Sequence, residues 1–230
     1  TRNFNSTSDF GRNFTEGKFG KGLVFDGVND YINASSAGNL DITDGITIST
    51  WVKPSAIDSI RDIVNKGDDS SSTYDVFIRG TGTVKFFIND GGTSPNDGVE
   101  TTQTLAANEW AHVAATFSPS ADTGIIYING IKSATDTITT STPSRASEPL
   151  IIGARRSSSG VSNFFRGIMD ELALLNYTMS EDEIKRIYER GVLKLNLSYR
   201  TSTDNSTWTA WTGAPNNTLT SITGFSIADD

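Results

Sequence analysis

Short runs in which apolar and polar residues alternate are the feature that most restricts how this chain folds. In "GITISTWVKP", Ile46, Ile48 and Val52 share one parity. The same period-two pattern recurs in "TVKFFIN", "WAHVAATF" and "TGIIYING". Such runs are typical of antiparallel strands that place one face on a core. Because no helical pattern separates the runs, the sequence predicts an all-β antiparallel β-sandwich and not an α/β sheet.

One helix is predicted near the end of these strands, in "MSEDEIKRIYERG". Ser180 is the expected N-cap, and Glu183 three residues later completes a capping box. Met179 and Ile184 have the spacing of a hydrophobic staple, and Gly191 is expected to end the helix. We expect this short C-terminal helix to close the sandwich and to pack on its edge.

The pattern changes after Gly191, which suggests a domain boundary there. The following residues present one apolar stripe, made of Leu193, Leu195, Leu197 and Tyr199. About two strands follow the helix, and so few strands do not bury a core alone. We therefore expect a β-sandwich over 1–191, and a partial second β unit or strand-exchange segment over 192–230.

Charge and composition exclude several functions. Lys plus Arg is 19 and Asp plus Glu is 27, so the net charge is −8 and nucleic acid is not an expected partner. No apolar stretch is long enough for membrane insertion. The chain has no cysteine and a single histidine, which excludes the usual Cys/His zinc sites and a cysteine nucleophile. It begins with Thr and not Met, so its start is interpreted as processed, trimmed or incomplete.

Seven motifs occur in an order that resembles a known family. They are "GKFGKGLVFDGVNDYI", "ITISTWVKP", "IVNKG", "NEWAHVAATF", "IYINGI", "LIIGARR" and "FFRGIMDELALLNYTMSEDEIKRIYERG". Together they resemble a laminin-G-like domain of the concanavalin A-like lectin/glucanase superfamily, of the type common in bacterial and archaeal surface proteins. The resemblance covers roughly Phe10 to Gly191. It implies two curved sheets in a jelly roll, often calcium-bound, that binds glycans or proteins.

The resemblance also implies a structural calcium ion (Ca²⁺) held by the aspartate that opens the last long strand, here Asp170. Asp170 shares strand parity with Ile168 and Leu172, so its carboxylate is expected on an apolar face and needs a partner. The early element "FDGVNDYI" offers oxygen ligands of the kind that calcium takes. The expected metal residues are Asp26, Gly27, Asn29, Asp30 and Asp170. The alternative is that Asp170 caps backbone amides and Asp30 is a turn residue, without a metal.

Loops are where a ligand is expected to bind, because loop positions usually carry specificity. The candidate ligand-binding residues are Asp68, Asp69, Tyr74, Asn89, Asp90, Arg155 and Arg156. Ordinary solvated turns are the alternative interpretation of the same segments.

The acceptor pattern for N-glycosylation recurs along the chain and favours an extracellular or cell-surface location. It occurs at Asn5, Asn13, Asn33, Asn176, Asn196, Asn205 and Asn216. The alternative is chance, because the chain is rich in Ser, Thr and Asn.

The sequence favours a protein that is not an enzyme. The Glu-x-Asp-x-x-Glu spacing of laminarinase-like enzymes on this fold is absent. His112 is the only histidine, and the family pattern places a histidine there without catalysis. The expected function is an extracellular binding or adhesion module for glycan or a partner surface. The alternative is a structural subunit of a filament, surface layer or virion fibre, in which the tail completes the sheet of a neighbouring copy.

Overall fold

The computed structural model describes residues 14–34, 40–42, 44–67, 73–88, 98–138, 148–157, 159–192, 198–200, 202–204, 206–210 and 212–213. The chain divides into two units, 1–191 and 192–230. Each unit is described by itself below. Within the described residues, no helix has the length and the apolar character needed to cross a membrane.

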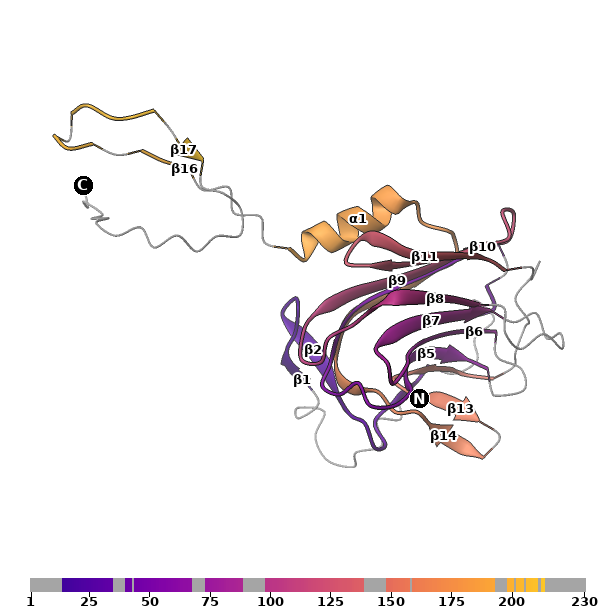
Figure 1. Ribbon diagram of the computed structural model, residues 1–230. Helices are drawn as coiled ribbons and strands as arrows, with labels where there is room; N and C mark the ends of the chain where they lie inside the picture. Colours follow the sequence, from indigo (N-terminus) through magenta and orange to yellow (C-terminus); the bar gives the residue numbers. More distant parts are fainter. Residues whose placement is uncertain are drawn as a thin grey trace. The chain divides into compact units, whose positions relative to one another are not determined.

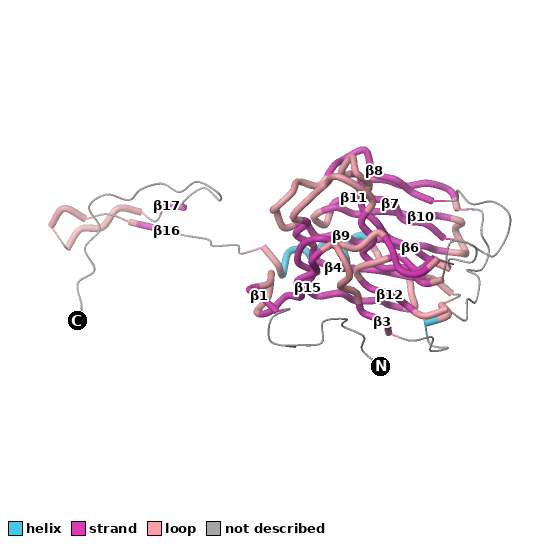
Figure 2. Tube along the Cα trace, turned by 90° about the horizontal axis from the view of Figure 1, so that it is seen from below, coloured by secondary structure: helices cyan, strands magenta, loops and turns pink. Residues whose placement is uncertain are grey.

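The first unit is a sandwich of two antiparallel sheets, as Figures 1 and 2 show. The seven-stranded sheet has the order β1 (Phe14–Glu16), β2 (Lys21–Asp26), β15 (Arg166–Leu175), β4 (Ile46–Pro54), β9 (Ala111–Ser118), β10 (Thr123–Ile128) and β11 (Ile131–Thr137). The six-stranded sheet has the order β3 (Ile32–Asn33), β12 (Leu150–Ile152), β5 (Arg61–Lys66), β6 (Tyr74–Ile78), β7 (Thr83–Ile88) and β8 (Gly98–Thr104). The predicted all-β sandwich is confirmed.

The core lies between the two sheets and is built from the alternating positions seen in the sequence. Ile46, Ile48 and Val52 from β4 are at most 1% exposed. Phe86 and Ile88 from β7 meet them in the same apolar cluster. A pleated strand sends alternate side chains to opposite faces, so the period-two pattern was sufficient to identify these core residues.

Helix α1 (Glu181–Arg190) begins as the sequence predicts. Ser180 Oγ accepts a hydrogen bond from the Glu183 amide at 3.4 Å, and Glu183 Oε2 accepts one from the Ser180 amide at 2.8 Å. This is the predicted capping box, which satisfies two amides that a helix start otherwise leaves unpaired.

The helix packs on the outer face of the seven-stranded sheet, over β4, β9 and β10, and it also contacts the edge strand β11, where packing was expected. Ile184 lies in a small apolar cluster with Ala114 of β9 and Tyr127 of β10. Tyr188 stacks on Trp51 of β4, with ring centroids 5.7 Å apart. The outer face of these central strands carries large apolar side chains, and α1 covers them.

Among its described residues, the second unit has one short pair of strands, β16 (Ser198–Tyr199) and β17 (Thr212–Gly213). Between them, Asp204 Oδ1 accepts hydrogen bonds from the amides of Ser206 and Thr207. The Arg200 guanidinium lies 4.7 Å from the centroid of the Trp208 ring. Leu193, Leu195 and Leu197 lie outside the described residues, so the burial of their stripe stays a prediction.

Candidate functional site

Asp170 leaves the seven-stranded sheet on its outer face, together with Ile168 and the ring of Trp51, whereas Leu172, expected on the same face as Asp170, packs on the core. Its Oδ2 accepts a hydrogen bond from the Phe19 amide in the β1–β2 turn at 2.8 Å, and its Oδ1 accepts one from the Glu171 amide at 2.9 Å. Asp170 pairs with Trp51 of β4, whose ring lies under α1. The partners of Asp170 are therefore backbone amides, the alternative noted from the sequence.

A β-bulge at Glu171 explains why simple alternation along β15 does not predict which side chains share a face. Asp170 pairs with Trp51, but Ala173 pairs with Ser49, so β15 holds one residue more than β4 across this interval. Glu171 adopts a left-handed φ of 51°. The extra residue moves Leu172 to the core side while Asp170 stays outside.

Asp26 and Asp30 close the turn that follows β2. Asp26 Oδ1 accepts hydrogen bonds from the amides of Val28, Asn29 and Asp30 at 2.7, 3.1 and 3.3 Å. Asp30 Oδ2 accepts one from the Asp26 amide at 3.0 Å. Burial raises the pKa of Asp26, but the bonds from the three amides outweigh it and leave the pKa lowered. Burial raises the pKa of Asp30.

The five residues expected to hold calcium do not converge. Asp26 pairs with Arg166 on β15, and Leu23 pairs with Met169. Asp170 thus lies four positions along β15 from the partner of Asp26, which is roughly 13 Å of extended strand. No group of three or more His, Cys, Asp or Glu able to hold a metal occurs in the described ranges. The five residues therefore do not fit a single calcium site, and whether the protein binds calcium stays a prediction.

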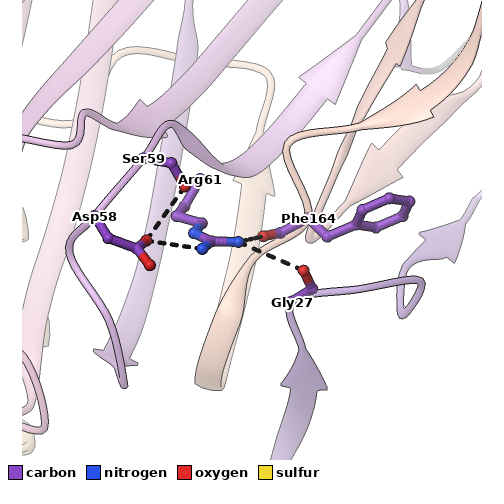
Figure 3. A network of polar contacts seen from close by, with 5 residues as sticks. All are labelled: Gly27, Asp58, Ser59, Arg61 and Phe164. Carbon is purple, nitrogen blue, oxygen red and sulfur yellow. Dashed lines mark hydrogen bonds and ion pairs between the residues drawn. The ribbon is translucent and has the colours of Figure 1, made fainter.

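Arg61, at the start of β5, joins three loops at one end of the sandwich (Figure 3). Its Nη2 donates to Asp58 Oδ1 at 2.8 Å in the β4–β5 loop. Its Nη1 donates to the Phe164 carbonyl at 2.9 Å in the β14–β15 loop and lies 3.5 Å from the Gly27 carbonyl in the β2–β3 loop. We name residues 26–31, 58–61 and 163–165 the Arg61 loop cluster.

The Arg61 loop cluster presents apolar, aromatic and polar side chains together. Val28 is 67% exposed and Ile60 is 39% exposed. The rings of Tyr31 and Phe164 lie 6.3 Å apart, and Figure 3 shows the Phe164 ring pointing away from the guanidinium of Arg61. Asn29 is exposed beside them. This combination of ring faces, amides and carboxylates is suited to binding a polar ligand that also has an apolar face.

A second polar cluster lies on the outer face of the six-stranded sheet, next to the Arg61 loop cluster. Arg155 of the hairpin β13 (Arg155–Ser157) and β14 (Gly160–Ser162) forms ion pairs with Asp62 of β5 and Asp75 of β6. Both carboxyls are fully buried. The Asp62 amide donates to the Asn163 carbonyl at 3.0 Å, which links the two clusters through the β14–β15 loop.

Those predicted ligand-binding residues that the structure describes lie in different parts of it and do not form one site. Arg155 and Arg156 lie in β13, where Arg156 forms an ion pair with Glu148 at 2.8 Å. Tyr74 lies in the core instead of on a loop, because its hydroxyl donates to the Leu40 carbonyl at 3.1 Å and its side chain is fully buried. Asp68, Asp69, Asn89 and Asp90 lie outside the described residues.

Two of the glycosylation candidates are described. Asn176 is exposed directly after β15, and Asn33 is half-buried in β3. Asn5, Asn13, Asn196, Asn205 and Asn216 lie outside the described residues.

Sequence reasoning missed Arg61, Asp62, Asp75 and Phe164. The available signal was the charged pair "RD" at the start of an apolar strand, in "RDIVNKG". His112, for which no catalytic role is expected, is fully buried, and its Nε2 lies 2.9 Å from Ser49 Oγ. Burial lowers the pKa of His112 to about 4, so the ring is neutral at physiological pH.

Two surface grooves lie elsewhere on the sandwich. One, of about 520 Å³, runs between α1 and the β10–β11 turn and is lined by Ile131, Lys185 and Tyr188 among others. The other, of about 320 Å³, opens beside β1, where the apolar Phe14 and Leu23 and the charged Lys21, Asp170 and Glu171 are among the residues that line it. Neither groove gathers residues of the two polar clusters.

Comparison with known proteins gives a family and a set of similar folds. A family profile described as the concanavalin A-like lectin/glucanases superfamily matches residues 26–185. No curated protein matches the chain by sequence. The chain resembles the binding domain of Paraclostridial Mosquitocidal Protein 1, with a TM-score of 0.63 and 16% identity over 77% of this chain and 45% of that one.

Two further solved structures have the same fold. The CBM40 of the Ruminococcus gnavus IT-sialidase, bound to alpha2,3 sialyllactose, gives a TM-score of 0.62 and 14% identity over 73% of this chain and 96% of that one. The botulinum neurotoxin serotype G binding domain gives 0.59 and 14% over 81% and 48%. The chain thus spans about half the length of the two toxin domains.

Proposed function

The chain belongs to the concanavalin A-like lectin/glucanase superfamily, and we propose that it is a non-catalytic binding module that recognises a glycan through the Arg61 loop cluster. The observation that carries this proposal is the arginine that fixes three loops at one end of a rigid sandwich. Loops held by a rigid scaffold are where binding residues concentrate.

The chemistry of the cluster matches a saccharide. The faces of Tyr31 and Phe164 offer apolar surface for the C–H groups of a sugar ring. The exposed carboxylate of Asp58 and the amide of Asn29 are hydrogen-bond partners for hydroxyl groups. Because Arg61 already holds the loops, little ordering entropy is lost on binding.

The similar structures support a binding role and not a catalytic one. They include a carbohydrate-binding module and toxin binding domains. Asp62 and Asp75, two buried carboxyls next to the loop cluster, are tied to Arg155 and closed to solvent, so neither is available to a substrate as an acid or base. Asp30, within the cluster, is also buried and accepts a hydrogen bond from the Asp26 amide. An extracellular setting is part of the proposal and rests on the family and the repeated glycosylation pattern.

A glycan array followed by calorimetry tests the proposal. Val28→Ala removes exposed apolar surface from the loop cluster, and Phe164→Ala removes a ring face. Each is expected to weaken binding of an array-selected glycan by about tenfold, the effect of losing roughly 1.4 kcal/mol.

Ile131→Ala is the matched control for Val28→Ala, because Ile131 is 72% exposed on β11, far in sequence from the loops. It should leave affinity unchanged. Equal losses for Val28→Ala and Ile131→Ala, or retention of no glycan by the wild type, would contradict the proposal.

A further inference from the structure

The hairpin β13–β14 is attached to the sandwich by side chains. Its two strands form a separate two-stranded sheet, without ladder pairing to the other described strands. Arg155 reaches Asp62 and Asp75. Beside it, the Arg156 amide donates to Asn65 Oδ1 at 3.2 Å. We name Arg155, Asp62 and Asp75 the clasp.

The clasp holds more acidic groups than basic ones. Arg155 Nε donates to Asp62 Oδ1 at 3.0 Å, and its Nη2 donates to Asp75 Oδ2. Asp62 Oδ2 and Asp75 Oδ1 are buried without a hydrogen-bond donor among the described residues. Two ionised carboxylates facing one guanidinium would leave an uncompensated buried charge, which is strongly unfavourable.

The surrounding cations are engaged elsewhere. The Arg61 guanidinium is directed at Asp58 and the Phe164 carbonyl. Arg79, which lies over the Phe77 ring as Arg155 does, pairs with Glu100 at 3.0 Å. Arg156 pairs with Glu148. No second cation of the described elements pairs with the two carboxyls, and the neutral side-chain amides of Asn163 and Asn65 lie beside Asp62 and Asp75, respectively.

We propose that Asp62 and Asp75 share one proton at neutral pH, so that a single negative charge balances Arg155 and the clasp is neutral. The proton lies between the two carboxyls, where it gives Asp62 Oδ2 or Asp75 Oδ1 the donor that it lacks. The hydrogen-bonded pair then fastens β13–β14 to the sheet without a buried net charge.

The electrostatics of the pair agree with this arrangement. Burial, followed by the charge of Asp62, raises the pKa of Asp75 well above its usual value. Burial also raises the pKa of Asp62, although Arg155 opposes it. Asp75 is therefore the carboxyl that keeps the proton.

The arrangement makes the hairpin sensitive to base. Loss of the shared proton would leave two ionised carboxylates facing the single guanidinium of Arg155, so one buried negative charge would be uncompensated. The hairpin would then loosen as pH rises, and the Asp62–Asn163 hydrogen bond would carry the change to the β14–β15 loop.

Infrared spectroscopy tests the shared proton directly. The wild type at neutral pH should show the C=O stretching band of a protonated carboxylic acid. Asp75→Asn should abolish this band, and Asp58→Asn, which alters a carboxyl bound to Arg61 outside the clasp, should leave it intact. Absence of the band from the wild type at neutral pH overturns the proposal.

Hydrogen exchange of the hairpin amides gives a second readout. Asp75→Asn keeps a donor and a neutral group in place of the protonated carboxyl, so the hairpin should stay protected. The double variant Asp62→Asn/Asp75→Asn leaves Arg155 unbalanced, and exchange should rise by about tenfold or more. If Asp75→Asn alone opens the hairpin as far as the double variant, the shared proton is not what fastens it.

Discussion

Asp75 is the single residue whose titration is expected to have the clearest effect on how the stability of this fold depends on pH. Its pKa is raised in the folded state, so the folded protein binds a proton that the unfolded chain releases. The stability from this proton is fully present below the unfolded pKa and is lost as pH rises through the folded pKa. We expect the free energy of unfolding to fall as pH rises above the unfolded pKa towards the raised folded pKa, and to fall less in Asp75→Asn. Urea denaturation of both proteins at mildly acidic and at alkaline pH measures this change in the free energy of unfolding. The same change with pH in the wild type and in Asp75→Asn would contradict the expectation.

Substitution of Asp170 tests whether calcium binds at this position. Asp170→Ala removes the acceptor for the Phe19 and Glu171 amides, which should cost about 1–3 kcal/mol. Because both partners are backbone amides, the loss should be the same in calcium and in a chelator. Calorimetry of both proteins in both buffers gives the comparison. A calcium-dependent rise in Tm that Asp170→Ala abolishes would instead make Asp170 a ligand.

At the scale of elements, the end of α1 is set by contact and not by backbone conformation. Gly191 has an ordinary φ of −85°, so the left-handed cap expected of a terminal glycine is not what selects it. A Cβ at this position would lie 2.2 Å from Cζ2 of the buried Trp51 ring. Gly191→Ala should therefore destabilise the sandwich by about 1–3 kcal/mol through overpacking. Gly191→Ala should destabilise a Trp51→Phe protein less than it destabilises the wild type, because the smaller ring leaves room for the added methyl group. An unchanged denaturation midpoint in Gly191→Ala would show that the contact with Trp51 does not matter.

Strand β4, strand β15 and helix α1 show which parts of the fold can be predicted from the sequence and which cannot. Period-two alternation identified the strands and the core side of β4, and the capping box located α1, because both signals are local. The side of β15 that carries Asp170 could not be read, since the bulge at Glu171 changes the parity and depends on pairing with β4. The loop cluster could not be read either, because Arg61 meets Gly27 and Phe164 only after distant strands have paired.

At the scale of the whole molecule, the boundary after Gly191 separates a sandwich with its own core from a segment whose described residues form one short strand pair. A chain ending at Gly191 should therefore unfold at the same denaturant midpoint as the full chain. Light scattering of both proteins tests the structural-subunit alternative, because assembly that requires 192–230 would support strand exchange. Unfolding of the shortened chain would show that the tail belongs to the sandwich.

Because Arg61 binds loops that are far apart in the sequence, the loop cluster can form only late in synthesis of the sandwich. Arg61 is synthesised early, but the carbonyl of Phe164 lies 103 residues further along the chain. A nascent or proteolytically shortened chain that lacks Phe164 has the first two loops without the third, however well its early strands have paired. If the Arg61 loop cluster is the binding site, as proposed, a ligand should bind the completed sandwich and not a fragment that lacks Phe164.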